Sequence, residues 1–378
     1  MGKEFISQSI SPERVLRGDG VWEEGKKIIR LMSQRPLLLG RSYSTKSIRE
    51  RLFQELSEIN LAPVFCEMDN DCCEKDLNKI DTIARSKECD SIIATGGGKV
   101  LDAGKLLSER LEIPCVTIPL SAATCAGWTA LSNIYSPEGK FIKDQELKCC
   151  PKLLIFDHNL IKTAPLRTLS SGIADALAKW YEASISCHDS QEGLVEQAVQ
   201  MSRVLRDQLI FDGVKAINNI NSEHWIKVTE ACALTAGLIG GIGGSKCRTA
   251  AAHALHNGLT QLNFSKEPLH GELVGFGILV QLKLEEKLSE NKLAAQSSKQ
   301  LTQLLKDLNI PITLDSLGLE NLSKQDLYNA CSFSCKPGSD IYNLPYKITP
   351  EILFQAVIET NNQNQVSLPG KWKKASRI

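Results

Sequence analysis

The chain has 378 residues, with 44 Lys and Arg against 44 Asp and Glu, so its formal net charge is zero. Because nucleic-acid-binding domains usually carry a basic face, this balance argues against a nucleic-acid partner. No apolar run reaches the ~18–20 residues that cross a bilayer, and the first ten residues lack the apolar centre of a signal peptide. We therefore expect a cytoplasmic protein without a membrane partner.

The 13 cysteines are odd in number, scattered, and form no C-x-x-C pair. Without an export signal, this pattern predicts reduced and mostly structural thiols rather than a disulfide framework or a four-cysteine zinc site.

Up to residue 161 the chain alternates short apolar runs with helical patterns. The helical patterns cover residues 45–58, 74–88 and 100–111. Continuous apolar strands joined by helices predict βαβ units and a doubly wound parallel sheet, interrupted by a hairpin at residues 133–141. The candidate strands cover residues 36–39, 62–65, 91–95, 114–118 and 153–156.

From residue 162 to 378 strand signals nearly vanish and amphipathic helical patterns follow one another. We therefore predict two domains, an α/β domain at residues 1–161 and an all-helical domain at residues 162–378. The predicted helices of the second domain cover residues 169–186, 193–211, 222–238, 249–262, 271–288, 292–308, 324–334 and 350–361.

A glycine-rich turn, Gly96-Gly97-Gly98-Lys99, joins the strand at 91–95 to the next helix. Backbone N–H groups at a helix N-terminus bind phosphate, and glycine lets the ligand approach the backbone. The turn fits neither the P-loop pattern nor G-x-G-x-x-G, so a purely structural tight turn remains the alternative.

Three of the six histidines, His253, His256 and His270, fall within one short stretch. The best third ligand is Asp175, on an apolar helix, although an i,i+4 salt bridge to Lys179 is its alternative role. One carboxylate and two imidazoles leave an open coordination position, which suits a catalytic zinc or ferrous ion.

Six segments resemble the glycerol dehydrogenase branch of the iron-containing alcohol dehydrogenases. They are GGGKVLDAGK (96–105), TCAGWTALSNIYSPEGKF (124–141), SGIADALAKWYEA (171–183), AAAHALHNGL (250–259), HGELVGFG (270–277) and YNLP (342–345). The resemblance spans nearly the whole chain. It implies the dehydroquinate synthase-like fold: an N-terminal dinucleotide-binding α/β domain and a C-terminal all-helical domain, with the active site between them.

The resemblance also implies roles for single residues. Asp175, His253 and His270 would hold the metal, usually zinc in this branch, with iron(II) as the alternative. The family forms dimers to octamers, so we expect a homo-oligomer. The positions that match cofactor contacts are Gly97, Gly98, Lys99, Asp102, Thr124, Thr129, Leu131 and Tyr135.

The sequence departs from the family pattern around the substrate. Cys125 stands where glycerol dehydrogenases carry an Asp that binds polyol hydroxyls, and a thiol is a weak hydrogen-bonding group. This departure argues against glycerol itself, and Trp128 nearby suggests a more apolar pocket. Leu120 and Ala123 likewise replace a Thr and a Ser of the family.

Arg41 stands where NAD-using members carry an Asp that binds the ribose 2′-hydroxyl. An Arg beside hydroxyl groups suits a 2′-phosphate, so we predict preference for NADP(H) over NAD(H). The alternative is a solvated loop Arg in an enzyme that accepts NAD(H).

Together these features predict a metal-dependent, NAD(P)-linked oxidoreductase that acts on a CH–OH group of a small molecule. His256 would relay a proton, or alternatively pack beside Asn257. Lys246 and Arg248 leave an anionic substrate open, as in glycerol-1-phosphate dehydrogenases or dehydroquinate synthases; a non-catalytic nucleotide-binding protein is the third alternative. The predicted substrate-binding residues are Cys125, Trp128, His253, Lys246 and Arg248.

Overall fold

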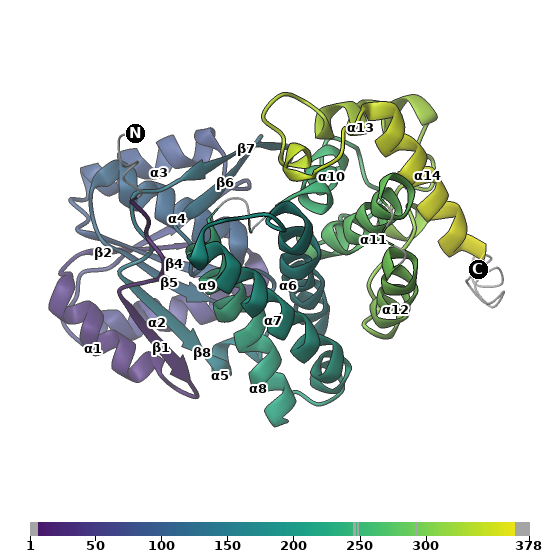
Figure 1. The fold of residues 1–378 in the computed structure, drawn as a ribbon. Coiled ribbons are helices and arrows are strands. Elements are labelled where there is room, and N and C mark those ends of the chain that lie inside the picture. The colour runs from purple at the N-terminus through teal and green to yellow at the C-terminus, as the bar shows by residue number, and fades with distance from the viewer. Residues whose placement is uncertain (1–6, 245–246, 248, 290, 292, 367–378) are drawn as a thin grey trace, which may run out of the picture.

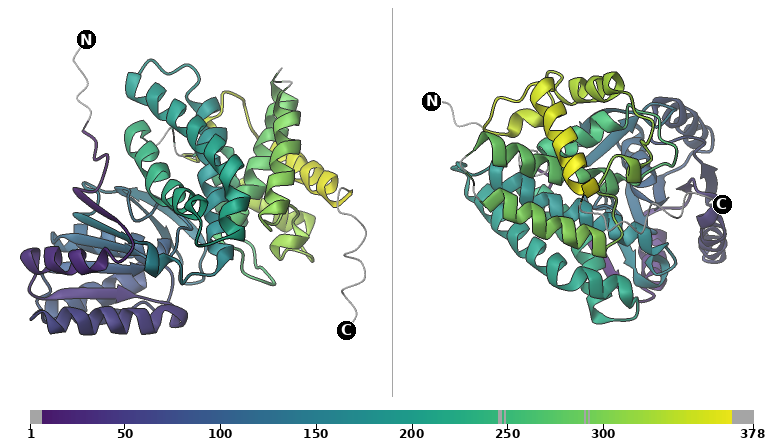
Figure 2. Two further views of the ribbon diagram at one scale, coloured as in Figure 1. Left: turned by 90° about the horizontal axis from the view of Figure 1, so that it is seen from below. Right: turned by 90° about the vertical axis from the view of Figure 1, so that its right-hand side faces the viewer.

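A computed structural model describes residues 7–244, 247, 249–289, 291 and 293–366. The N-terminal α/β part, purple to blue in Figure 1, lies beside a helical part coloured teal to yellow. Figure 2 shows the helices of this second, helical part gathered to one side of the α/β part.

Six parallel strands form the sheet, in the order β1-β8-β5-β4-β2-β3. This doubly wound sheet confirms the predicted fold class. The strands are β1 (Arg14–Gly18), β2 (Pro36–Gly40), β3 (Val64–Glu67), β4 (Ser91–Gly96), β5 (Cys115–Pro119) and β8 (Leu153–Asp157).

Helices cover both faces of the sheet, which explains the continuous apolar runs. Alternate residues of β2 point to opposite faces: Leu38 packs with α1 (Trp22–Met32) and α2 (Lys46–Glu58). Leu37 and Leu39 pack on the other side with α3 (Glu74–Ser86) and α4 (Gly98–Leu111).

The interruption before β8 is a two-stranded antiparallel hairpin, as predicted, formed by β6 (Leu131–Tyr135) and β7 (Phe141–Glu146). Its turn passes through Gly139, whose φ of 83° lies in the left-handed region that favours glycine.

The short helix α5 (His158–Ile161) joins the two parts: Leu160 packs into the core with α1 and α2, and Ile161 into the core with α6. Among the described residues, the later α-helices form the helical part. The longest are α6 (Leu166–Ser186) and α7 (Gly193–Asn218). The others are α8 (Glu223–Glu230), α9 (Ala236–Gly243), α10 (Ala251–Leu259), α11 (His270–Leu288), α12 (Leu293–Asp307), α13 (Lys324–Ser334) and α14 (Pro350–Val366).

The helix predicted at residues 222–238 is α8 and α9 joined through a π-helical segment, Ala231–Thr235. The combined helix, Glu223–Gly243, is long and apolar enough to cross a membrane, but 61% of its most apolar window is buried inside the protein. Trp225, Val228 and Ile239 pack into the same core as α6, so this segment is a core helix of the helical part.

Candidate active site

The sheet changes direction between β2 and β4. From β2 the chain moves outward to β3 and then returns to β4 on the other side of β2. Ligands of doubly wound sheets bind where the carboxyl ends of two such strands diverge. Arg41 follows β2 and the glycine turn follows β4, so both lie at this point.

The glycine turn leads directly into α4. Gly97 is the N-cap residue, and its carbonyl accepts hydrogen bonds from the backbone N–H groups of Val100 and Leu101 at 3.0 and 3.1 Å. A Cβ on Gly97 would meet no atom within 4 Å, whereas one on Gly98 would lie 2.9 Å from Thr124 Oγ1. The helix N-terminus therefore offers open space for an anion, bordered by the segment that carries Thr124.

Arg41 and Lys99 both form ion pairs with the carboxylate of Asp71. The Asp71 side chain is 4% exposed, whereas those of Arg41 and Lys99 are 37% and 35% exposed. Lys99 Nζ also lies 4.9 Å from the centroid of the Tyr135 ring. Two cations thus share one buried carboxylate, which leaves the group with an excess positive charge.

The remaining predicted cofactor positions cluster behind the turn. Asp102 is buried, and burial raises the pKa of its carboxyl group. The charge of Lys105, whose Nζ lies 3.1 Å from Asp102 Oδ1, opposes this rise. Lys105 also donates to the carbonyls of Thr129 and Leu131. Thr129 and Tyr135 are buried and Leu131 is partly buried. Through Lys105, Asp102 is therefore connected to the segment that carries these residues.

The three predicted metal ligands converge from three helices. Asp175 lies on α6, His253 on α10 and His270 at the start of α11. One donor atom from each lies within 4.8 Å of the others. Asp175 Oδ1 is 3.3 Å from His253 Nε2 and 3.4 Å from His270 Nε2.

Close helix contacts bring these ligands together. A Cβ on Gly172 would lie 2.0 Å from the Ala122 carbonyl oxygen, and one on Gly271 would lie 1.8 Å from that of Ser171. Glycine at both positions lets α6 approach the segment before Cys125 and the start of α11. Arg167 pairs with Glu272, whose carboxylate also accepts from the Leu269 N–H, and this fixes the turn that carries His270.

A metal ion fits this donor set. Asp175 Oδ1 is one of three buried side-chain polar atoms that lack a hydrogen bond among the described residues. Burial alone would raise the pKa of Asp175, but the two facing imidazoles and Lys179 hold that pKa well below its usual value. The carboxylate is therefore ionised and has an unused oxygen facing two imidazole nitrogens, which is the chemistry of a zinc or iron(II) site.

His253 has a second carboxylate neighbour that sequence reasoning missed. Burial opposes a charged imidazole, but Glu182 and Asp175 raise the pKa of His253 to about 9. Glu182 lies on α6 seven residues after Asp175, and this two-turn spacing on one helix face is the signal that could have identified it.

His256 lies outside the ligand cluster but touches it. Its Nδ1 pairs with Asn257 Oδ1 at 2.9 Å, and its ring centroid is 4.2 Å from that of His270. Burial and the nearby charge of His270 hold the pKa of His256 well below its usual value. The contacts with Asn257 and His270 are those of the packing alternative, and the proton relay by His256 stays a prediction.

The predicted substrate residues occupy different environments. Cys125 is partly buried and packs against the core of the helical part, which includes Cys232 of the π-helical segment. Trp128 is buried against Gly237, and its indole N–H donates to the Ile10 carbonyl. Lys246 and Arg248 lie outside the described residues.

Two positions at which the sequence departs from the family pattern, Leu120 and Ala123, lie close before Cys125. Leu120 is buried with the core beneath α1 and α2, and its N–H donates to the Gly96 carbonyl. Ala123 is partly buried beside Gly172.

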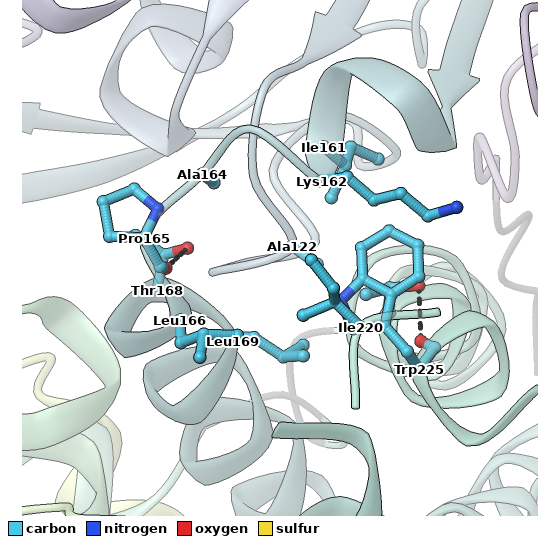
Figure 3. A pocket seen from close by; sticks show the side chains of 11 residues that line it. Ala122, Ile161, Lys162, Ala164, Pro165, Leu166, Thr168, Leu169, Ile220 and Trp225 are labelled. Atoms are coloured by element: carbon cyan, nitrogen blue, oxygen red, sulfur yellow. Dashed lines mark hydrogen bonds between the residues drawn. The ribbon is translucent and has the colours of Figure 1, made fainter. Parts of the chain in front are cut away.

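Two cavities border parts of the chain described above, one at Ala122 and the other at Lys105. A cavity of about 110 Å³ lies where the chain passes from α5 to α6 and α8, and Figure 3 shows the Lys162 side chain running alongside the Trp225 ring. Lys162 Nζ is 5.4 Å from the centroid of that ring. A larger cavity of about 590 Å³ lies at the amino end of β5, bordered by Cys149, Lys148 and Glu112. Neither includes a candidate metal ligand.

The glycine turn at the switch point of the sheet could hold the phosphates of a dinucleotide, and the clustered ligands of the helical part could hold a metal ion. Comparison with known proteins identifies the family. Residues 12–158 match the family of iron-containing alcohol dehydrogenases. The chain is 43% identical over 362 residues to an uncharacterised oxidoreductase of Synechocystis sp., covering 96% of this chain and 93% of the relative.

Two further comparisons are informative. Hydroxycarboxylate dehydrogenase A of Escherichia coli is 32% identical, over 75% of this chain and 78% of the relative. The crystal structure of glycerol dehydrogenase from Schizosaccharomyces pombe superposes with a TM-score of 0.82 at 25% identity, covering 95% of this chain and 91% of that one. The chain belongs to the iron-containing alcohol dehydrogenase family, as an oxidoreductase similar to its alcohol and polyol dehydrogenases.

Proposed function

We propose that the protein is a metal-dependent, NAD(P)-linked oxidoreductase that interconverts an alcohol and a carbonyl compound. Asp175, His253 and His270 hold the metal, zinc in the first instance and iron(II) as the alternative. The observation that carries this proposal is the unpartnered Oδ1 of buried Asp175, facing both imidazole Nε2 atoms.

When bound, the metal supplies Lewis-acid polarisation of the substrate oxygen and the nicotinamide supplies hydride chemistry. The protein provides binding and orientation. Backbone N–H groups of Gly98 and Lys99, at the start of α4, bind the cofactor phosphates. Thr124 and the buried group around Asp102 would contact the nicotinamide part of the cofactor.

NADP(H) is the preferred cofactor in this proposal. Arg41 and Lys99 keep about a third of their side chains exposed and share a single carboxylate, so one positive charge remains in excess. That excess favours a 2′-phosphate over a 2′-hydroxyl.

The substrate is a small alcohol or carbonyl compound other than glycerol. Cys125 replaces the carboxylate expected to bind polyol hydroxyls, and a thiol binds a hydroxyl weakly. The second candidate is an anionic substrate, supported by the hydroxycarboxylate dehydrogenase relative and by Lys246 and Arg248 in the sequence. A homo-oligomer in the cytoplasm completes the proposal.

Asp175→Asn tests the proposal because it removes the carboxylate charge while keeping the side-chain shape. The variant should lose bound zinc and activity but still bind NADPH, measured by metal analysis, turnover and cofactor fluorescence. His253→Ala should behave in the same way. Full activity in either variant would refute the metal role and leave a non-catalytic nucleotide-binding protein as the alternative.

A further inference from the structure

Glu182 is a completely buried carboxylate on the helix that carries Asp175. Its side chain is 0% exposed, and it lies seven residues, about two helical turns, after Asp175. A buried charge persists only where hydrogen bonds and opposite charges compensate it. The contacts of Glu182 therefore indicate what it does.

Among the described residues, the Glu182 carboxylate forms hydrogen bonds with one short segment, residues 250–253. Its Oε1 accepts from the backbone N–H of Ala250 at 2.7 Å and from that of His253 at 3.0 Å. Its Oε2 lies 2.5 Å from His253 Nδ1. The carboxylate thus supplies the acceptor that Ala250, as N-cap residue of α10, lacks in its own side chain.

These contacts determine the orientation of the His253 ring and which of its nitrogens carries a proton. Because a carboxylate only accepts, His253 Nδ1 donates its proton to Glu182, and Nε2 on the opposite side of the ring lies 3.3 Å from Asp175 Oδ1. The backbone bond from His253 N to the same carboxylate fixes the start of its side chain as well.

We propose that Glu182 is the positioning residue of the metal site, holding His253 in the ring orientation and tautomer that present Nε2 to the ion. This inference rests on the proposed metal role of Asp175, His253 and His270. An outer carboxylate of this kind raises metal affinity by orienting the ligand, and its loss typically costs 10–100-fold.

The test is zinc affinity of the purified full-length protein, measured by competition with a chromophoric chelator. Glu182→Gln can still accept the two backbone N–H bonds, but its amide N–H₂ cannot accept from His253 Nδ1. We expect zinc to bind about 10–100-fold more weakly to Glu182→Gln than to the wild type. The absorption spectrum of bound Co²⁺ should also change, because the ligand ring is held differently.

Glu285→Gln is the matched control. Glu285 is another buried carboxylate of the helical part, but it pairs with Gln281 and Asn291. It should keep wild-type zinc affinity. Melting temperature in excess chelator, measured for both variants, reports on folding apart from metal binding.

If Glu182→Gln does not fold, Glu182→Asp, which keeps the charge but shortens the side chain, takes its place with the same expected loss of affinity. Wild-type zinc affinity in a folded Glu182 variant would overturn the inference and leave Glu182 with a purely structural role. Absence of stoichiometric binding of both zinc and iron(II) in the wild type would instead overturn the proposed function.

Discussion

Arg41 and Asp71 form an ion pair beside the switch point of the sheet, between the segments that follow β2 and β3. The carboxylate is buried and also binds Lys99 of the glycine turn, so the loop that would meet the ribose is tied to the turn that would meet the phosphates. This ion pair distinguishes Arg41 from a loop Arg whose guanidinium contacts only solvent.

Arg41→Ala should weaken NADPH binding about 10- to 100-fold, because a charge-assisted contact to the 2′-phosphate is lost. NADH affinity should change by less than about threefold, as expected for loss of a partly exposed ion pair. Cofactor fluorescence titration measures both. Arg35→Ala is the control, since Arg35 pairs with Glu88 at the opposite end of β2. Equal weakening of both cofactors, or tighter NADH than NADPH binding in the wild type, would contradict the predicted preference.

Cys125→Asp should increase turnover of glycerol by at least about tenfold, because it restores a strong acceptor for substrate hydroxyls. The measurement compares kcat/KM for glycerol and for a simple monohydric alcohol, which should not gain. Cys149→Asp is the control, because Cys149 is exposed and borders the larger cavity at the amino end of β5. An unchanged preference in Cys125→Asp would show that this position does not contact substrate.

If His256 serves in packing, His256→Phe should keep kcat within about threefold of the wild type, because an aromatic ring still packs against His270. The pH profile of kcat should keep its shape. A fall of about 10²–10⁴-fold, the size of a lost general acid or base, would restore the relay role that the sequence suggested for His256.

Glu230 connects the helical part to the sheet, and its ionisation should contribute to stability. The hydrogen bond from His158 Nε2, at 3.2 Å, and the charge of Arg17 lower the pKa of Glu230 below its usual 4.5. A lowered folded-state pKa stabilises the fold above the unfolded pKa, and this contribution is lost as pH falls through the folded value.

Glu230→Gln should therefore reduce the free energy of unfolding by about 1–2 kcal/mol at pH 7. The difference from the wild type should stay constant down to about pH 5 and shrink at lower pH. Urea unfolding at several pH values measures it. A difference that grows as pH falls would contradict this role for Glu230.

The sequence predicts much of the sheet because buried parallel strands are continuous apolar runs. It misses β1, where two of the five residues are Arg and the strand is only half buried at the sheet edge. It places the third strand two residues early, at 62–65, because Pro63 resembles its apolar neighbours but has no N–H for a sheet ladder. The π-helical segment carries no local signal, so the sequence pattern predicts an ordinary α-helix there.

The sequence points to His253 and His270 because three of the six histidines fall in one short stretch, and the family resemblance pairs them with Asp175. It gives no sign of Asp71, whose partner Arg41 lies 30 residues away, and for Glu182 only the two-turn spacing from Asp175, since its partner His253 lies 71 residues away. Local patterns therefore reveal the residues that would touch metal and cofactor, but not the buried carboxylates that hold them.

The central claim is metal-dependent hydride transfer with a nicotinamide cofactor. The most direct measurement is oxidation of NADPH, beside NADH, by zinc-loaded protein against small aldehydes, ketones, hydroxyketones and oxo acids, some phosphorylated. The account predicts turnover that is faster with NADPH, is lost in chelator and returns with zinc. No turnover across this panel, in protein shown to hold its metal, would contradict it.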